Sequence, residues 1–240
     1  MLVLAIDSTM NGCSAGVYCS DQGLLSSESH EMNRGQAERL MPMIGCALEK
    51  AAKVYADIDL IAVTKGPGAF TGMRIGLATA KALSLAMNVP VIGVCTFQAV
   101  LHTGLAEVDD VDGRYAVLIE TKRQDFYVQL FKAYSKEQVI PLSEAQSMPL
   151  SEISVMFDGN ICVLIGDALD RFRAQAQGDL EYLSFVDVSL PSLKSIAYLA
   201  LCDEHGNKEG GVVKPAYIRA PDVSLPKNPP RILDLDVFSG

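Results

Sequence analysis

Apolar and polar residues follow a regular pattern in the first 94 residues, which predicts an α/β unit built on one sheet. The run at 2–6 is continuously apolar, as is typical of a strand buried on both faces. Tight-turn signals such as Asn11-Gly12 separate it from two alternating runs, and two helical patterns follow with apolar runs between and after them. These runs predict one mixed five-stranded sheet. The predicted strands cover residues 2–6, 13–20, 24–31, 60–63 and 89–94.

Residues 36–52 project as a helix with an apolar half and a charged half. Packing on one sheet needs a narrower stripe than this, so we expect part of the apolar half to meet a second helix. Its centre should face the sheet, and its flank should be free for that second contact. The centre comprises Ala37, Met41, Ile44 and Leu48, and the flank comprises Leu40, Met43 and Ala47.

The helix predicted over 72–87 has two apolar faces where a surface helix of a monomer normally has one. The second face must therefore be covered either by more of this chain or by another protein, and the pattern leaves both readings open. One face carries Ile75, Ala78, Ala82, Leu85 and Ala86, and the other carries Met73, Gly76, Leu77, Ala80, Leu83 and Met87.

A glycine-rich turn, GPGAFTG, joins the strand at 60–63 to this helix. We expect Gly66, Gly68 and Gly72 to supply backbone with positive φ, and Thr71 to cap the helix. The turn does not match G-x-G-x-x-G, and Gly72 is not followed by the Lys-Ser/Thr of a Walker loop. We therefore do not interpret it as a phosphate-binding loop.

The second half of the chain repeats the element order of the first half without close sequence repeat, which is the pattern of a duplicated ribonuclease H-like fold. Its strands are predicted at 114–121, at 126–134, near Val139 and at 161–167, and its helices start near Ala168 and at Ser192. The acidic stretch at 107–113 is the best candidate for the boundary. The predicted units are a first lobe at 1–106, to which a helix near 191–204 could add, a second lobe at 113–220 and an extended tail at 221–240.

The charge balance disfavours a protein that binds nucleic acid unaided. The 240 residues include 20 Lys and Arg against 29 Asp and Glu, a net charge of −9, whereas gripping phosphates normally requires a basic excess. Any RNA contact should therefore be local or made mainly by a partner. No apolar run reaches the roughly 18–20 residues of a membrane span, and no basic region precedes the first strand, so we expect a cytoplasmic protein with no membrane contact.

Metal-binding and hydrolase motifs are not evident in the sequence. The six cysteines form no C-x-x-C pair and lie mostly in apolar runs, so we expect reduced core residues. No histidine is paired with another at helical spacing, and there is no G-x-S-x-G elbow. The charged turn at 120–125 could line a cleft or form a solvated hairpin. We expect neither a metal nor a catalytic residue.

Asp7, Ser8 and Thr9, at the end of the first strand, are the one weak candidate for a cofactor-binding site. An acidic residue with hydroxyls on the next turn can hold hydrated Mg²⁺ and a phosphate. The alternative is a polar turn that closes the strand, which is favoured because no second carboxylate motif completes a metal site.

Five segments together resemble the TsaB family, also called YeaZ: LAIDST, RGQAERLMPMI, GPGAFTGMRIGLATAKALSLA, VPVIGVCTFQA and PAYIRAPD. The resemblance covers residues 1 to about 222, and GPGAFTGMRIG is its specific motif. It implies the two-lobed actin-like ATPase fold, an α/β fold of the ribonuclease H-like type with mixed sheets flanked by helices. It also implies a dimerisation subunit, without an active site of its own, of the bacterial tRNA threonylcarbamoyladenosine machinery.

The resemblance implies the partners of the chain and an interface. TsaD, a homologue, transfers the threonylcarbamoyl group to N6 of adenosine 37 in tRNAs that read ANN codons, and TsaE, an ATPase, completes the complex. Family members form homodimers when TsaD is absent, and tRNA is contacted only indirectly. The first two helices of each subunit form the family's dimer, which corresponds here to the surplus apolar faces. The implied interface residues are Leu40, Met43, Ala47, Met73, Gly76, Leu77, Ala80, Leu83 and Met87.

Two departures limit what the resemblance carries over. TsaD holds its metal through two histidines on its first long helix, and residues 34–39 contain none, so that metal cannot be bound in the same way. Many relatives have Asp-Ala-Arg where this chain has Glu120-Thr121-Lys122-Arg123. The alternatives are an active ATPase, a sugar-kinase-like phosphotransferase or a metallopeptidase-like enzyme of the same fold, all motivated by the residues at 7–9, and a plain homodimer.

Overall fold

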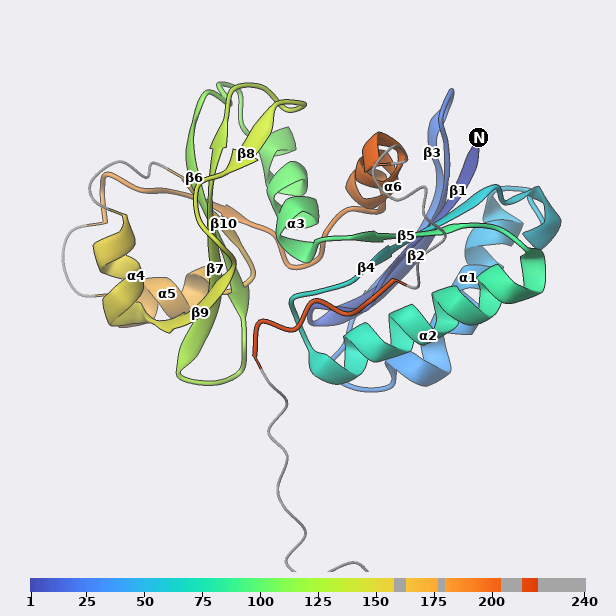
Figure 1. Ribbon diagram of the computed structural model, residues 1–240, viewed down its shortest axis with the longest axis horizontal. Helices are drawn as coiled ribbons and strands as arrows, with labels where there is room; N and C mark the ends of the chain where they lie inside the picture. The colour runs from blue at the N-terminus through green and yellow to red at the C-terminus, as the bar shows by residue number, and fades with distance from the viewer. Residues whose placement is uncertain (158–162, 177–179, 204–212, 220–240) are drawn as a thin grey trace, which may run out of the picture.

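The computed structural model describes residues 1–157, 163–176, 180–203 and 213–219, which form two α/β lobes, each built on a mixed sheet (Figure 1). The predicted tail at 221–240 lies outside these residues. No helix in the described ranges is long and apolar enough to cross a membrane.

The first sheet has the predicted five strands, in the order β3-β2-β1-β4-β5. β1, β2 and β3 form an antiparallel meander, whereas β4 and β5 run parallel to β1. The apolar run of β1 is almost wholly buried, because helices cover both faces of the sheet. The strands are β1 (Leu2–Asp7), β2 (Gly12–Cys19), β3 (Gly23–Glu31), β4 (Leu60–Thr64) and β5 (Val91–Val94).

Two pairs of helices cover this sheet. α1 (Gln36–Lys50) and α2 (Phe70–Met87) lie side by side on one face, and α3 (Thr96–Gly104) and α6 (Leu193–Cys202) cover the other (Figure 1). α6 comes from the far end of the chain and packs against β1 and β2. The short 3₁₀ helices η1 (Tyr55–Asp57) and η2 (Leu105–Glu107) follow α1 and α3.

The second sheet has six strands, in the order β11-β10-β6-β7-β8, with β9 paired to β7. α4 and α5 cover its outer face, and α3 packs on its inner face. β8 and β10 confirm the strands predicted near Val139 and at 161–167. β9, α4 and β11 were not predicted from the sequence. The elements are β6 (Gly113–Glu120), β7 (Asp125–Ala133), β8 (Val139–Pro141), β9 (Gln146–Pro149), α4 (Leu150–Met156), β10 (Val163–Gly166), α5 (Leu169–Gln175) and β11 (Ser184–Asp187).

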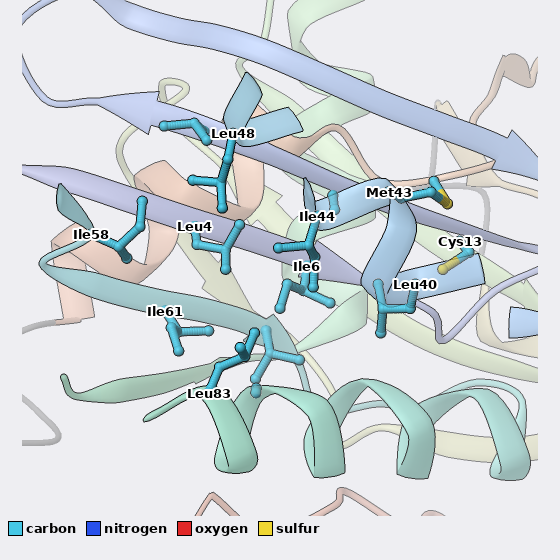
Figure 2. Close-up of a cluster of buried hydrophobic side chains, with 14 residues drawn as sticks. Leu4, Ile6, Cys13, Leu40, Met43, Ile44, Leu48, Ile58, Ile61 and Leu83 are labelled. Carbon is cyan, nitrogen blue, oxygen red and sulfur yellow. The ribbon is translucent and has the colours of Figure 1, made fainter. Parts of the chain in front are cut away.

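The core between α1, α2 and the first sheet corrects the predicted orientation of α1 (Figure 2). Leu40 and Met43, predicted on a free flank, are 1% and 5% exposed and point toward the sheet. Ala37 and Met41, predicted to face the sheet, are exposed instead. When half of a helix surface is apolar, the pattern does not show which residues lie in the middle of the buried face. The predicted rotation of α1 about its axis was therefore wrong by part of a turn.

The glycine turn between β4 and α2 lies against the end of β1. Gly66 has a φ of +104°, as predicted, and a Cβ on Gly68 would lie 2.0 Å from the carbonyl oxygen of Thr9. Gly72 is required for a different reason than predicted, because it lies inside α2 without positive φ. A Cβ on Gly72 would lie 1.9 Å from the carbonyl oxygen of Ser8. Close backbone approach, rather than backbone conformation, therefore selects this glycine.

α2 begins earlier than predicted. Its first residue is Phe70 and its N-cap is Ala69, so Thr71 lies inside the first turn and does not cap it. The backbone N–H of Ala69 donates instead to the carbonyl oxygen of Thr9, at 2.6 Å. The start of α2 is thus fixed by the end of β1 and not by a side-chain cap.

The cysteines are only partly core residues, which corrects the prediction for two of them. All five described thiols are free. Burial raises the pKa of Cys13 to about 11, so this thiol is unreactive at neutral pH. Cys13 is buried, Cys19 and Cys95 are half-buried, Cys46 and Cys202 are exposed, and Cys162 lies outside the described residues.

The contact at Gly72 generates a stability prediction. Gly72→Ala should lower the free energy of unfolding by more than about 2 kcal/mol, because the new methyl group must displace backbone. Gly45→Ala is the matched control, since Gly45 is also helical and nothing lies within 4 Å of its added Cβ. That control should gain roughly 0.5–1 kcal/mol from the better helix propensity. Urea denaturation measures both, and equal effects of the two substitutions would contradict the assignment.

Candidate functional site

Asp7 ends β1 as a completely buried acidic side chain, two residues before Thr9, which lines the cleft between the lobes. Its Oδ1 accepts hydrogen bonds from the backbone N–H of Thr9 (3.1 Å), the Thr9 hydroxyl (2.6 Å) and the Thr64 hydroxyl (2.6 Å). Its Oδ2 has no hydrogen-bond partner among the described residues. Burial raises the pKa of Asp7, although these hydrogen bonds oppose the shift.

The hydroxyl of Ser8 also points into the protein. It donates to the carbonyl oxygen of Gly72 at 2.8 Å and thereby ties the end of β1 to the first turn of α2. Of the three residues predicted as a weak cofactor site, only Thr9 lines the cleft, because Asp7 and Ser8 are enclosed behind it. Their contacts fit the alternative reading, a polar turn that closes the strand. Cofactor binding at these residues stays a prediction.

The cleft itself is a cavity of about 300 Å³ at the carboxyl ends of the parallel strands of both sheets. Ligands of open α/β sheets usually bind at this edge. The charged turn at 120–125 contributes to the wall of the cavity, which resolves the choice between cleft and solvated hairpin. The lining comes from the first lobe (Thr9, Met10, Asn11, Pro67, Gly68, Ala69, Phe70, Met73), the second lobe (Glu120, Thr121, Lys122, Arg123, Tyr127, Asp167) and the segment 216–219.

Glu120 and Asp167 are the acidic groups of the cleft, and each is held from within the second lobe. Glu120 Oε2 accepts from Nε of Arg171 at 2.7 Å, and the guanidinium of Arg171 lies 3.6 Å from the centre of the Phe126 ring. Asp167 Oδ1 accepts from the backbone N–H of Glu120 at 2.8 Å. Burial, reinforced by the charge of Glu120, raises the pKa of Asp167 to about 7.

Asp167 and Arg171 were missed by the sequence reading, although one signal was available. Asp167 directly follows the buried run of β10, and β10 is parallel to β6, which ends at Glu120. Adjacent parallel strands place the residues after them together, so the pair of acidic residues could have been expected. Nothing local in the sequence places Arg171 on Glu120, because that contact depends on the docking of α5.

Two further polar contacts join different parts of the chain around the cleft. Nζ of Lys122, in the second lobe, donates to Oδ1 of Asn33, in the first lobe, at 2.9 Å. The guanidinium of Arg219 is ion-paired with Asp125 at the start of β7. Within the described ranges, no group of three or more His, Cys, Asp or Glu side chains is arranged as a metal site.

The outer face of α2 is a second candidate site and corrects the predicted partner side. Leu85 is 76% exposed, and Ala78, Ala82 and Ala86 on the same face are exposed as well. The opposite face packs on the first lobe's own core and sheet. The predicted interface residues Leu40, Met43, Ala47, Met73, Gly76, Ala80 and Leu83 are all buried in the chain itself, and Leu77 and Met87 are half-buried.

The physical reason for this error is the composition of α2. Both faces are apolar, and the face that carried the bulkier Met73 and Leu83 was assigned to the partner. The inner face combines Met73 and Leu83 with the small residues Gly76 and Ala80, which let α2 approach the sheet closely, while Leu85 remains outside, so neither apolarity nor side-chain size distinguishes the two faces in the sequence. The prediction that α2 has a surplus apolar face holds, but the free face is the one with Ala78, Ala82, Leu85 and Ala86.

Two mixed sheets that share α3 and enclose a cleft at their strand ends define a two-lobed protein of the actin-like, ribonuclease H-like class, as predicted. The structure of YeaZ from Pseudomonas aeruginosa has the same fold, with a TM-score of 0.74 over 90% of this chain and 99% of that one, at 21% identity. Residues 26–170 match the family described as TsaD, tRNA N6-adenosine threonylcarbamoyltransferase, and the chain belongs to this family.

Curated relatives narrow the likeness within that family. The tRNA threonylcarbamoyladenosine biosynthesis protein TsaB of Buchnera aphidicola is 35% identical over 95 residues, 40% of this chain and 44% of the relative. A tRNA N6-adenosine threonylcarbamoyltransferase of Dictyoglomus turgidum is 55% identical over 62 residues, 26% of this chain and 19% of the relative. The chain spans less than half the length of these curated relatives. The similarity to TsaB and to the YeaZ structure confirms the resemblance to the TsaB family.

The raised pKa of Asp167 predicts a pH dependence of stability. Between about pH 4 and pH 7 the folded state keeps a proton that the unfolded state has lost, so the contribution of Asp167 to stability falls as pH rises through this window. Asp167→Asn keeps an acceptor for the Glu120 N–H but does not titrate. The difference in free energy of unfolding, Asp167→Asn minus wild type, should therefore become more positive by about 1 kcal/mol or more as the pH rises from 4.5 to 7.5.

Thermal or urea unfolding across this pH range measures the difference. Asp170→Asn is the matched control, since Asp170 is an exposed carboxylate at the start of the neighbouring helix α5. A constant difference between wild type and Asp167→Asn over the whole range would contradict the proposed titration.

Proposed function

We propose that this chain is a non-catalytic subunit that binds a TsaD homologue and supports N6-threonylcarbamoylation of adenosine 37 in tRNAs that read ANN codons, with TsaE as a further partner. The observation that carries this proposal is the apolar outer face of α2, which is exposed among the residues that the structure describes. Leu85 lies on the same side of the helix as the exposed Ala78, Ala82 and Ala86, and contiguous exposed apolar surface marks sites of interaction with other proteins. Membership of the TsaD family supports a partner of the same fold.

The outer face of α2 has the chemistry of a helix-docking surface. The 18 residues of α2 span about 27 Å, which is enough for several turns of contact with another helix. Ala78, Ala82 and Ala86 recur every four residues, and small side chains at this spacing allow close approach of a second helix. Leu85 would then supply a buried anchor. The same face can meet its own copy, so a homodimer is expected when TsaD is absent.

Two acidic side chains at the strand ends, Asp7 behind the cleft and Glu120 in its wall, are engaged in contacts within the chain, which supports a role other than catalysis for them. Asp7 is enclosed and bonded to its own turn, and Glu120 is paired with Arg171. Neither side chain is therefore free to act as a general base on a ligand in the cavity. The net charge of −9 supports an indirect contact with tRNA, with most of the phosphate contacts made by the partner.

The proposal predicts that a charge on the outer face of α2 blocks assembly. Leu85→Glu should weaken the complex with the cognate TsaD by about tenfold or more, because an unpaired carboxylate would be buried at the interface. Val155→Glu is the matched control, since Val155 is 78% exposed on α4 in the other lobe. Calorimetric titration with purified TsaD measures the affinities, and circular dichroism verifies that both variants fold.

Equal affinity of Leu85→Glu and Val155→Glu for TsaD would rule out α2 as the docking helix. Substitutions at Ala80 do not test the proposal, because that side chain is fully buried and a charge there would unfold the lobe.

The cleft of about 300 Å³ favours one other function, an ATPase or phosphotransferase of the same fold. Its basic side chains Lys122 and Arg123 could contact phosphate. ATP turnover by the isolated chain that is lost in Asp7→Ala would support that enzyme over the scaffold.

A further inference from the structure

The described segment 213–219 runs from the first lobe toward the second (Figure 1), and its residues 216–219 line the cleft. At its start, Val213 packs directly on β5, where its Cγ1 occupies the space that a side chain on Gly93 would need. The backbone N–H of Ala216 then donates to the carbonyl oxygen of Lys65, at the end of β4, at 2.7 Å. The first half of the segment is thus bound to the first lobe.

The middle of the segment holds the first turn of α2. The Tyr217 ring lies 5.3 Å from the Phe70 ring, and its hydroxyl accepts from Nε of Arg74 at 3.0 Å. The guanidinium carbon of Arg74 lies 3.8 Å from the centre of the Phe70 ring. This aromatic and cationic cluster sits at the cleft end of α2, whose outer face is described above.

The end of the segment is bound to the second lobe. Ile218 packs against the core that α3 shares with the second sheet. Arg219 pairs with Asp125, a buried carboxylate at the start of β7 that also accepts from Ser147. A buried carboxylate is costly to leave unpaired, so this ion pair contributes more than an exposed one would.

The other two crossovers between the lobes, at α3 and before α6, lie above the segment 213–219 in Figure 1. They contact each other where α3 ends and α6 begins, because the backbone N–H of Ser192 donates to the hydroxyl of Thr103 at 2.9 Å. Nδ1 of His102 is 2.9 Å from the hydroxyl of Ser195 in the same cluster. Two neighbouring crossovers on one side of the molecule form a hinge, about which the lobes can rotate only as far as the packing of α3 against both of them allows.

We infer that the segment 213–219 is a strap that fixes the angle between the lobes. It binds both lobes, so rotation about the hinge must break its contacts with Lys65, Arg74 or Asp125. The strap therefore sets the width of the cavity and holds the first turn of α2 in place. This role follows from intramolecular contacts and does not rest on the proposed function.

Hydrogen–deuterium exchange on the full-length chain tests the strap through Arg219→Gln, which removes the ion pair with Asp125. Amides that line the cleft, at 65–70 and 120–127, should exchange about threefold faster or more, because the lobes open more often. Amides in the centres of β1 and β10 should keep their protection. Lys214→Gln is the matched control, since Lys214 is an exposed cation in the same segment.

A second variant, Tyr217→Ala, removes the contact with Arg74 and leaves the ion pair in place. Faster exchange confined to the cleft in either variant supports the strap. Wild-type exchange at the cleft in both variants overturns it. Loss of protection throughout both sheets also overturns it, because the segment would then be part of the core and not a tie between two stable lobes.

Discussion

The structure depends on the contact between the end of β1 and the first turn of α2, where two backbones meet without room for a side chain. Gly68 and Gly72 bring the turn against the carbonyl oxygens of Thr9 and Ser8, and the hydroxyl of Ser8 donates to the carbonyl of Gly72. This contact sets the direction in which α2 leaves the sheet. The position of the cleft wall and the orientation of the outer face of α2 both follow from it. The polar residues after β1 are therefore explained by the fold before any ligand is invoked.

α3 has a comparable role between the lobes, because it belongs to both cores. Ala99 packs with the first sheet, while Phe97, Val100 and Leu101 pack with Tyr115 and Phe131 of the second. α3 thus contributes to the buried clusters of both lobes beside the hinge. On the cleft side, by contrast, polar contacts such as that between Lys122 and Asn33 connect them. Relative motion of the lobes should therefore be easiest on the cleft side.

The sequence was sufficient to predict the sheet of the first lobe, its two long helices and the duplicated fold, because alternation and buried runs are local signals. It was not sufficient to orient α1 and α2. Apolar residues cover half or more of each helix, and only the packed structure reveals that Leu40 and Met73 point inward while Met41 and Leu85 point outward. β9 and β11 are short and exist through pairing with β7 and β10, which no local pattern encodes. The salt bridge between Arg171 and Glu120 joins elements far apart in the chain and was equally invisible.

The position of α6 has a consequence for how the protein is made. Val3 and Ala5 of β1 share a core with Ile196 and Ala197 of α6, so one face of the first sheet is covered only in part, by α3, until α6 has been synthesised. The elements of the second sheet follow one another from Gly113 to Asp187 without such a gap. On the ribosome, all strands of the second sheet are therefore available before α6 can complete the first lobe, although domains usually fold in order from the N-terminus. The part of the first sheet that α6 covers in the folded protein therefore stays uncovered in the nascent chain until α6 has emerged.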